Sequence, residues 1–155
     1  LRKVYEPMAQ MLDDFYKKYD NDTVQIYGSY RTTDFQQELY DQDLAMTGEE
    51  GSTRVAKPGF SEHESGYAFD LTETATGDYQ GTGAYAWINE NCYKYGFIER
   101  YKEDKTELTQ IQPEPWHFRY VGIPHAYYIT KNNLCLEEYI SMLSQYIYGE
   151  HHLEF

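Results

Sequence analysis

The stretch SEHESGYAFDL (residues 61–71) decides the fold, because it joins a polar segment to a regular strand pattern. In its second half, large side chains share one face at Tyr67, Phe69 and Leu71, and the opposite face carries Gly66, Ala68 and Asp70. This period of two predicts a half-buried β-strand from Gly66 to Leu71. The face with small side chains ends in a carboxylate, which leaves room for a group to sit against it.

Further helices and strands are predicted on both sides of this strand. Apolar residues at helical spacing, Thr33 with Gln36 as a capping box, and Gly96 as a left-handed cap mark the helices. The predicted helices cover residues 4–19, 33–46, 84–95 and 136–147, and the predicted strands cover residues 24–27, 66–71, 97–101 and 116–121. Residues 47–62 should form a long loop, and such loops are often functional. We therefore expect an α+β fold, a small, mainly antiparallel sheet with flanking helices.

Length and composition fit one packed domain over residues 1–155. Of the 155 residues, 41% are hydrophobic and 17% aromatic, including 18 tyrosines, which excludes a disordered tail. The net charge of −13 would repel nucleic acid and anionic membranes, so neither is an expected partner. No run of about 18 apolar residues occurs, and the sequence opens at Leu1 without a leader. We expect a signal or a membrane anchor to lie upstream of this sequence.

The two cysteines, Cys92 and Cys135, are far apart in the sequence and too few for a disulfide framework. We expect each to pack as a small apolar side chain, with a mutual bridge as the alternative.

Two segments supply groups that suit a catalytic metal, residues 61–70 and the run EPWH at 114–117. Zinc in catalytic sites takes three nitrogen, oxygen or sulfur ligands from the protein and keeps a fourth position for water. His63, Asp70 and His117 would supply this set. Glu114 would take a proton from the water and return it to the leaving amine. A histidine beside acidic residues is also common on ordinary surfaces, so composition alone leaves that alternative open for His63.

The backbone around Glu114 needs an irregularity if this interpretation holds. Pro113 and Pro115 flank Glu114, which argues against a helix and for an extended, kinked segment. In a regular strand, residues 114 and 117 would face opposite sides. Both side chains can reach one metal only if the strand bends or carries a bulge.

These motifs resemble those of a known family. The run Ser61-x-His63-x-x-Gly66-x-Ala68-x-Asp70, followed by EPWHFRYVG at 114–122, closely resembles the VanY-type D-alanyl-D-alanine carboxypeptidases. That family includes peptidoglycan L,D-carboxypeptidases and is related to the VanX dipeptidases. The segment GSYRTT at 28–33, with Gln36, is similar to the family's arginine-bearing segment, as are residues 95–97 and 100–101 to theirs. The resemblance covers about residues 25–122. Gln110 departs from it, because many relatives are expected to have glycine there, which concerns loop geometry and substrate preference.

The resemblance implies a zinc D-Ala-D-Ala carboxypeptidase or hedgehog-like fold, with zinc at His63, Asp70 and His117 and with Glu114 as the catalytic base. It also implies that Arg31 binds the substrate carboxylate or polarises the scissile carbonyl. A planar guanidinium suits either task. Without the resemblance, an ordinary surface salt bridge would be the alternative for Arg31.

Three further residues are candidates for binding substrate. Gln36 and Ser61 could form hydrogen bonds to the peptide, and Trp116 could wall the pocket. For each of them, a purely structural role is the alternative.

The expected protein is a monomeric bacterial metallopeptidase, secreted or anchored at the cell surface, that removes the terminal D-alanine from peptidoglycan stem peptides. An L,D-carboxypeptidase acting on tetrapeptide stems, or an endopeptidase of similar design, is the nearest alternative, since pocket contacts worth a few kcal/mol set specificity. A cell-wall binding module without catalysis and a structural domain with a closed metal site are alternatives from other classes. The presence of all three ligands and of Glu114 speaks against the binding module. Retention of Glu114, which is not needed as a ligand, speaks against the closed metal site.

Overall fold

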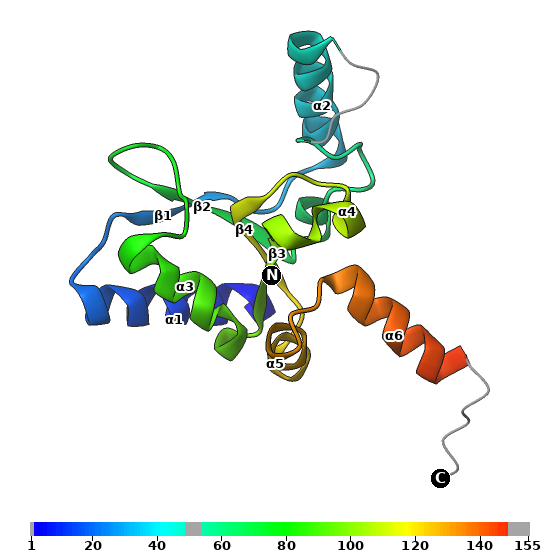
Figure 1. Cartoon of the computed structure of the whole chain (residues 1–155). Helices are drawn as coiled ribbons and strands as arrows, with labels where there is room; N and C mark the ends of the chain where they lie inside the picture. The colour runs from blue at the N-terminus through cyan, green and yellow to red at the C-terminus, as the bar shows by residue number, and fades with distance from the viewer. Residues whose placement is uncertain (1, 49–53, 149–155) are drawn as a thin grey trace.

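The computed structural model describes residues 2–48 and 54–148 and has the predicted α+β architecture. Its sheet has four strands in the order β1-β2-β4-β3, and every neighbouring pair is antiparallel. The strands are β1 (Val24–Gly28), β2 (Ala68–Glu73), β3 (Phe97–Tyr101) and β4 (Glu114–Tyr120). Helices α1 and α3 lie along one face of this sheet, whereas α2 projects from the opposite side (Figure 1).

The helices are α1 (Arg2–Tyr19), α2 (Thr33–Thr47), α3 (Ala86–Asn91), α4 (Thr106–Thr109), α5 (Ile123–Lys131) and α6 (Leu136–Tyr148). Short 3-10 turns are η1 (Glu62–Ser65), η2 (Gly83–Tyr85), η3 (Cys92–Tyr95) and η4 (Glu103–Lys105). The long helices α1, α2 and α6 occur where the sequence predicts them. The side chain of Ile147, part of the predicted apolar stripe of α6, lies outside the described side chains.

Several local predictions need correction. Thr32, not Thr33, caps α2, because its side chain accepts a hydrogen bond from the backbone N–H of Phe35. The strand predicted from Gly66 begins at Ala68, since Gly66 has a φ of 70° and ends the η1 turn. The strand is also buried on both faces rather than half-buried, because η1 covers the face that carries Asp70. The predicted helix over 84–95 is divided into η2, α3 and η3.

Two hydrophobic clusters hold the helices in place. The larger cluster packs α1 against the sheet and includes Met11, Phe15, Phe69, Phe97 and Phe118. The smaller one joins β3 to α5 and α6 through Ile98, Ala126, Ile129 and Tyr139. Fully burying one such side chain contributes roughly 1.5–3 kcal/mol to the free energy of unfolding. Both clusters therefore stabilise the packing of the helices on the sheet.

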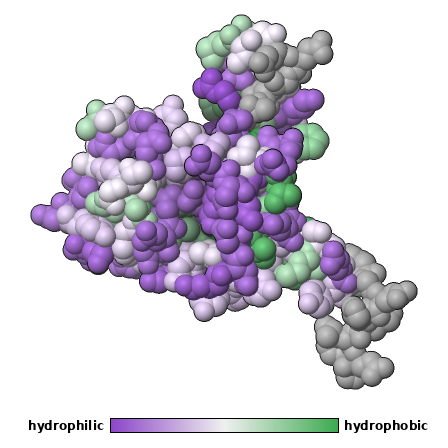
Figure 2. Space-filling model, viewed as in Figure 1, coloured by the Kyte–Doolittle hydropathy of each residue, from purple (hydrophilic) through white to green (hydrophobic). Residues whose placement is uncertain are grey.

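Cys92 and Cys135 are both buried and free, as the prediction of apolar packing requires. Hydrophilic residues cover most of the face seen in Figure 2, in agreement with the acidic composition. None of the helices within residues 2–48 and 54–148 combines the length and the apolar composition of a membrane span.

Candidate metal centre

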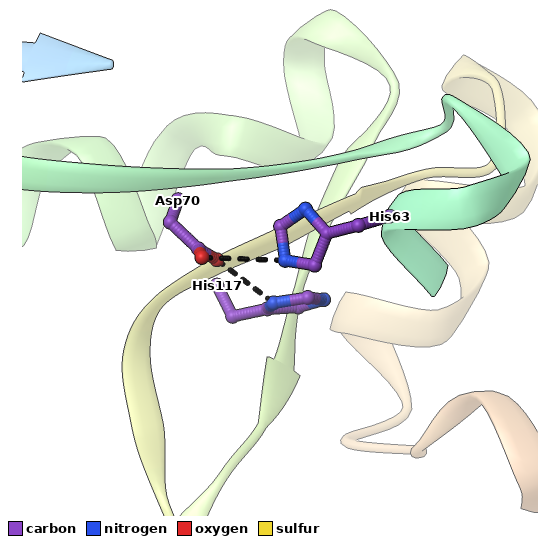
Figure 3. Close-up of side chains that lie close together, drawn as sticks. All are labelled: His63, Asp70 and His117. Carbon is purple, nitrogen blue, oxygen red and sulfur yellow. Dashed lines mark hydrogen bonds and ion pairs between the residues drawn. The ribbon is translucent and has the colours of Figure 1, made fainter. Parts of the chain in front are cut away.

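Three side chains from three separate elements meet on the face of the sheet opposite the larger cluster. Asp70 in β2 and His117 in β4 are directly paired in the sheet register, and His63 lies on η1 above them. Their candidate ligand atoms lie within 4.8 Å of one another, and all three residues are buried. Figure 3 shows the two imidazole rings converging on the carboxylate. The structure therefore brings together the three residues that the sequence predicts as ligands.

The hydrogen bonds of the two imidazoles select the nitrogen that each ring presents to the centre. His63 Nδ1 lies 2.7 Å from the carbonyl oxygen of Ser29, whereas His63 Nε2 lies 3.2 Å from Asp70 Oδ2. In His117 it is Nδ1 that faces the centre, 2.9 Å from Asp70 Oδ1, whereas Nε2 points away from it and lies 3.2 Å from Glu62 Oε2. Metal-ligating histidines commonly donate their other N–H to a carbonyl or carboxylate. His63 Nε2, His117 Nδ1 and the Asp70 carboxylate thus form a donor set that fits a metal ion.

A bulge in β4 brings Glu114 to the same centre. Glu99 pairs with Phe118, but Tyr101, two residues further along β3, pairs with Glu114, so β4 holds extra residues between these pairs. As a result, Glu114 Oε2 lies 3.7 Å from His117 Nδ1, although residues 114 and 117 would face opposite sides of a regular strand. The irregularity that the sequence required is confirmed.

Charges in the centre are strongly coupled. Burial acts to lower the pKa of His117, but hydrogen bonds to Asp70 and Glu62 raise it to about 9. Burial acts to raise the pKa of Asp70, but hydrogen bonds from His117 and His63 hold it well below its usual range. Burial, with the negative charge of Asp70 adding to it, raises the pKa of Glu114 to about 7. Carboxylates that stabilise a positive charge this strongly would also stabilise a divalent cation.

Arg31 reaches the centre from the turn between β1 and α2. Its Nη2 lies 3.1 Å from Asp70 Oδ2, and its Nη1 lies 3.4 Å from Gln36 Oε1. A side chain at Gly28 would place Cβ 3.0 Å from Asp70 Oδ2 and 3.4 Å from Arg31 Nη2, so it would force these two side chains to shift. The alternative of an ordinary surface salt bridge does not describe Arg31, because its side chain is only 21% exposed and its ion pair is with Asp70 of the centre.

The other predicted substrate-binding residues have local partners. Gln36 is fully buried, and its Nε2 donates to the carbonyl of Ala56. The backbone N–H of Ser61 donates to Glu64 Oε2 at the start of η1. Trp116 is half-buried and packs against the larger hydrophobic cluster.

Gln110 ends α4 in the left-handed conformation, with a φ of 60°. That conformation costs a residue with a side chain roughly 1–2 kcal/mol and suits glycine, the residue that the resemblance implies at this position.

Sequence reasoning did not predict the partners behind His117. Glu62 contacts both His117 and Arg100, and Arg100 pairs with Glu137 of α6. Glu137 lies 20 residues beyond His117, and no local pattern links the two. The nearest signal was the likeness of Arg100-Tyr101 to the family.

Comparison with known proteins assigns the chain to a family. The model of the family described as "VanY: D-alanyl-D-alanine carboxypeptidase" matches residues 1–123. The chain belongs to the VanY family. It is 44% identical over 127 residues to a D-alanyl-D-alanine carboxypeptidase of Enterococcus faecalis, a match that covers 75% of this chain and 47% of that protein. The chain thus spans about half the length of this relative.

Two solved structures of related carboxypeptidases have the same fold. A D,D-pentapeptidase VanY mutant from a VanB-type resistance cassette, in complex with Zn(II), is 39% identical, with a TM-score of 0.70 over 87% of this chain and 82% of that one. The LD-carboxypeptidase LdcB is 35% identical, with a TM-score of 0.80 over 90% of this chain and 67% of that one.

Proposed function

We propose that residues 1–155 form the catalytic domain of a zinc-dependent D,D-carboxypeptidase that removes the terminal D-alanine from peptidoglycan stem peptides. The observation that carries the proposal is the convergence of His63, Asp70 and His117, with Glu114 and Arg31 on their border. Membership of the VanY family supports the substrate class.

His63 Nε2, His117 Nδ1 and the Asp70 carboxylate would hold the zinc ion. When bound, zinc would act as a Lewis acid and lower the pKa of a water molecule to about 7. Two imidazoles and one carboxylate leave a coordination position open, as catalytic zinc sites do and closed structural sites do not. This donor set therefore favours catalysis over a structural metal site.

Glu114 is the proposed acid and base. Its carboxylate is only 16% exposed and lies beside the nitrogen of His117 that faces the centre. In the metal-free centre, burial raises its pKa to about 7. A buried carboxylate beside the ligand set can accept a proton in one step and donate it to the leaving amine in the next. Glu62 and Glu64 are less suited to this role, because Arg100 holds Glu62 and backbone N–H groups of residues 59 and 61 hold Glu64.

Arg31 is proposed to bind the substrate carboxylate or to polarise the scissile carbonyl. The chain is acidic, so a peptide carboxylate needs a local cation to approach the centre. Gln36 accepts a hydrogen bond from Arg31 and is anchored on Ala56, so it holds the guanidinium in place. Ser61 and Trp116 stay as candidates for contact with more distant parts of the peptide.

A second candidate is L,D-carboxypeptidase activity on tetrapeptide stems. The likeness to LdcB favours it, because LdcB is an LD-carboxypeptidase with the same fold.

Action on the cell wall requires the domain to work outside the cytoplasm. We propose that a secretion signal or anchor outside residues 1–155 delivers it there and that the domain acts as a monomer.

The test is mass spectrometry of stem pentapeptide and tetrapeptide, each incubated with the zinc-loaded protein. Loss of one alanine from the pentapeptide alone supports the D,D-carboxypeptidase, and loss from the tetrapeptide alone supports the L,D-alternative. If neither peptide is cleaved by protein that holds one zinc per chain, the proposal is wrong and a binding module is favoured.

A further inference from the structure

A chain of charged side chains runs from His117 to the C-terminal helix α6. Glu62 Oε2 lies 3.2 Å from His117 Nε2, and Glu62 Oε1 lies 2.8 Å from Arg100 Nε. Arg100 then binds both carboxylate oxygens of Glu137, Nη1 to Oε2 at 3.0 Å and Nη2 to Oε1 at 2.5 Å. Glu62 belongs to η1, Arg100 to β3 and Glu137 to α6. Three elements that are distant in the sequence thus contact one another on the Nε2 side of His117.

Arg100 is the fixed point of this chain. It is only 8% exposed, and three nitrogens of its guanidinium are engaged by the two glutamates. A buried charge is tolerated when it is paired and its hydrogen bonds are satisfied. A planar guanidinium that binds a carboxylate through two nitrogens has one orientation, so Glu137 determines where Arg100 Nε points. Arg100 Nε in turn is the nearest cation to Glu62, since it lies 2.8 Å from Oε1, whereas Arg119 Nη1 lies 3.9 Å from that oxygen.

Arg100 also supports the imidazole through a second contact. Its guanidinium carbon lies 4.7 Å from the ring centroid of Tyr101, and the Tyr101 ring lies 5.1 Å from the ring of His117. Movement of Arg100 would therefore disturb both the hydrogen-bonding partner and the packing partner of His117.

We propose that Glu62, Arg100 and Glu137 are positioning residues for His117, and that α6 thereby forms part of the support of the metal centre. A carboxylate that accepts the Nε2–H of His117 fixes the tautomer in which Nδ1 is free to bind a metal, and it fixes the plane of the ring. Glu137 lies outside residues 1–123, so the matched family region does not contain the last link. The inference rests on the proposed zinc site.

The chain offers a matched control for the decisive variant. Glu137 and Glu138 are neighbours in the first turn of α6, and each pairs with one cation. Glu138 pairs with Lys105 and accepts from the backbone N–H of Cys135, away from the metal centre. Glu137→Gln and Glu138→Gln therefore remove the same charge from the same turn, but only the first removes the bidentate partner of Arg100.

The measurement is zinc affinity, obtained by competition with a chelator of known affinity. Glu62→Ala should weaken zinc binding by about 10- to 100-fold, as loss of the partner of a metal-ligating histidine does. Glu137→Gln should weaken it by a smaller factor, and Glu138→Gln should leave it unchanged. Thermal unfolding of each variant shows that it is folded. If Glu62→Ala does not fold, Glu62→Gln, which keeps the shape of the side chain, takes its place.

A double-mutant cycle tests whether Glu137 acts through Glu62. If it does, Glu137→Gln should cost little zinc affinity in a protein that already lacks the Glu62 carboxylate. The inference is overturned if Glu137→Gln binds zinc as the parent protein does, or if it costs the same factor with and without Glu62. Failure of the parent protein to bind zinc would instead contradict the proposed function, so the two failures are distinguishable.

Discussion

The carboxylate of Glu114 lies 3.7 Å from His117 Nδ1, the same nitrogen that faces Asp70. The distance is longer than a hydrogen bond, so the Glu114 carboxylate lies next to the three proposed ligands and forms no hydrogen bond with His117. A group in that position can exchange a proton with a substrate held at the centre. This geometry separates the proposed role of Glu114 from that of the three ligands.

Glu114→Ala should therefore keep zinc but lose hydrolysis. Removal of a positioned acid/base slows a reaction by roughly 100-fold to 10,000-fold, so kcat on a stem pentapeptide should fall by that factor. Metal content is measured on the same preparation. Glu107→Ala, an exposed glutamate of α4, is the control and should retain activity. Near-normal turnover of Glu114→Ala would move the role to another carboxylate, with Glu62 and Glu64 to be tested next.

Arg31→Ala should lower kcat/KM without removing the metal. A charge-assisted hydrogen bond contributes about 1.5–3 kcal/mol, which corresponds to a loss of about one to two orders of magnitude. Arg31→Lys should restore only part of the activity, because lysine offers a point charge without the planar fork. Steady-state kinetics on a stem peptide test both variants. Lys57→Ala removes an exposed cation that lies between α2 and η1, and it serves as the control. Equal efficiency of Arg31→Ala and the parent protein would exclude a substrate role for Arg31.

The sequence predicted those features that depend on local pattern. Alternation located β2, and Pro113 and Pro115 argued for an extended segment at Glu114. The bulge in β4 was predicted because Glu114 and His117 of one strand must reach the same metal. Features that depend on contact between distant segments were not foreseen. The burial of both faces of β2 results from η1 folding over Asp70, and a period of two carries no information about such a cover.

Helix α5 and the link to Glu137 show the same limit. Helix α5 (Ile123–Lys131) has nine residues and begins directly after Gly122, so its apolar period is too short to stand out. Glu137 meets Arg100 only because the smaller hydrophobic cluster packs α6 against β3. No spacing within the sequence could reveal that pairing.

Gly96→Ala should destabilise the fold. Gly96 has a φ of 87°, and an added Cβ would lie 2.8 Å from Tyr120 Cε2 and 3.1 Å from the backbone nitrogen of Ile123. The left-handed conformation costs an alanine roughly 1–2 kcal/mol, and crowding of the added Cβ increases this cost. We therefore expect the free energy of unfolding to fall by about 2 kcal/mol or more. For a chain of this length, that corresponds to a fall in Tm of roughly 4–8 °C.

Gly77→Ala separates the two contributions to this loss. Gly77 has a φ of 70°, and an added Cβ would meet no atom within 4 Å. Gly77→Ala should therefore lose only the stability that the left-handed conformation costs an alanine. Calorimetry at a fixed zinc concentration compares the Tm values of the two variants. Equal Tm values for the two variants would show that Tyr120 and Ile123 shift to make room for the added Cβ without a loss of stability.

Glu99→Gln should make the protein more stable at neutral pH but not at acidic pH. Burial raises the pKa of Glu99, although Asn89 Nδ2 donates to its Oε2 at 3.0 Å. Between the ordinary and the raised pKa, the folded state binds more protons than the unfolded state, so stability falls as pH rises through this window. Glutamine keeps an acceptor for Asn89 and cannot ionise, so the variant should gain stability over the parent above the window and match it below. Denaturant unfolding at about pH 4 and about pH 7 measures the difference, with the exposed Glu90→Gln as the control. An equal effect at both pH values would show that ionisation of Glu99 does not contribute to stability.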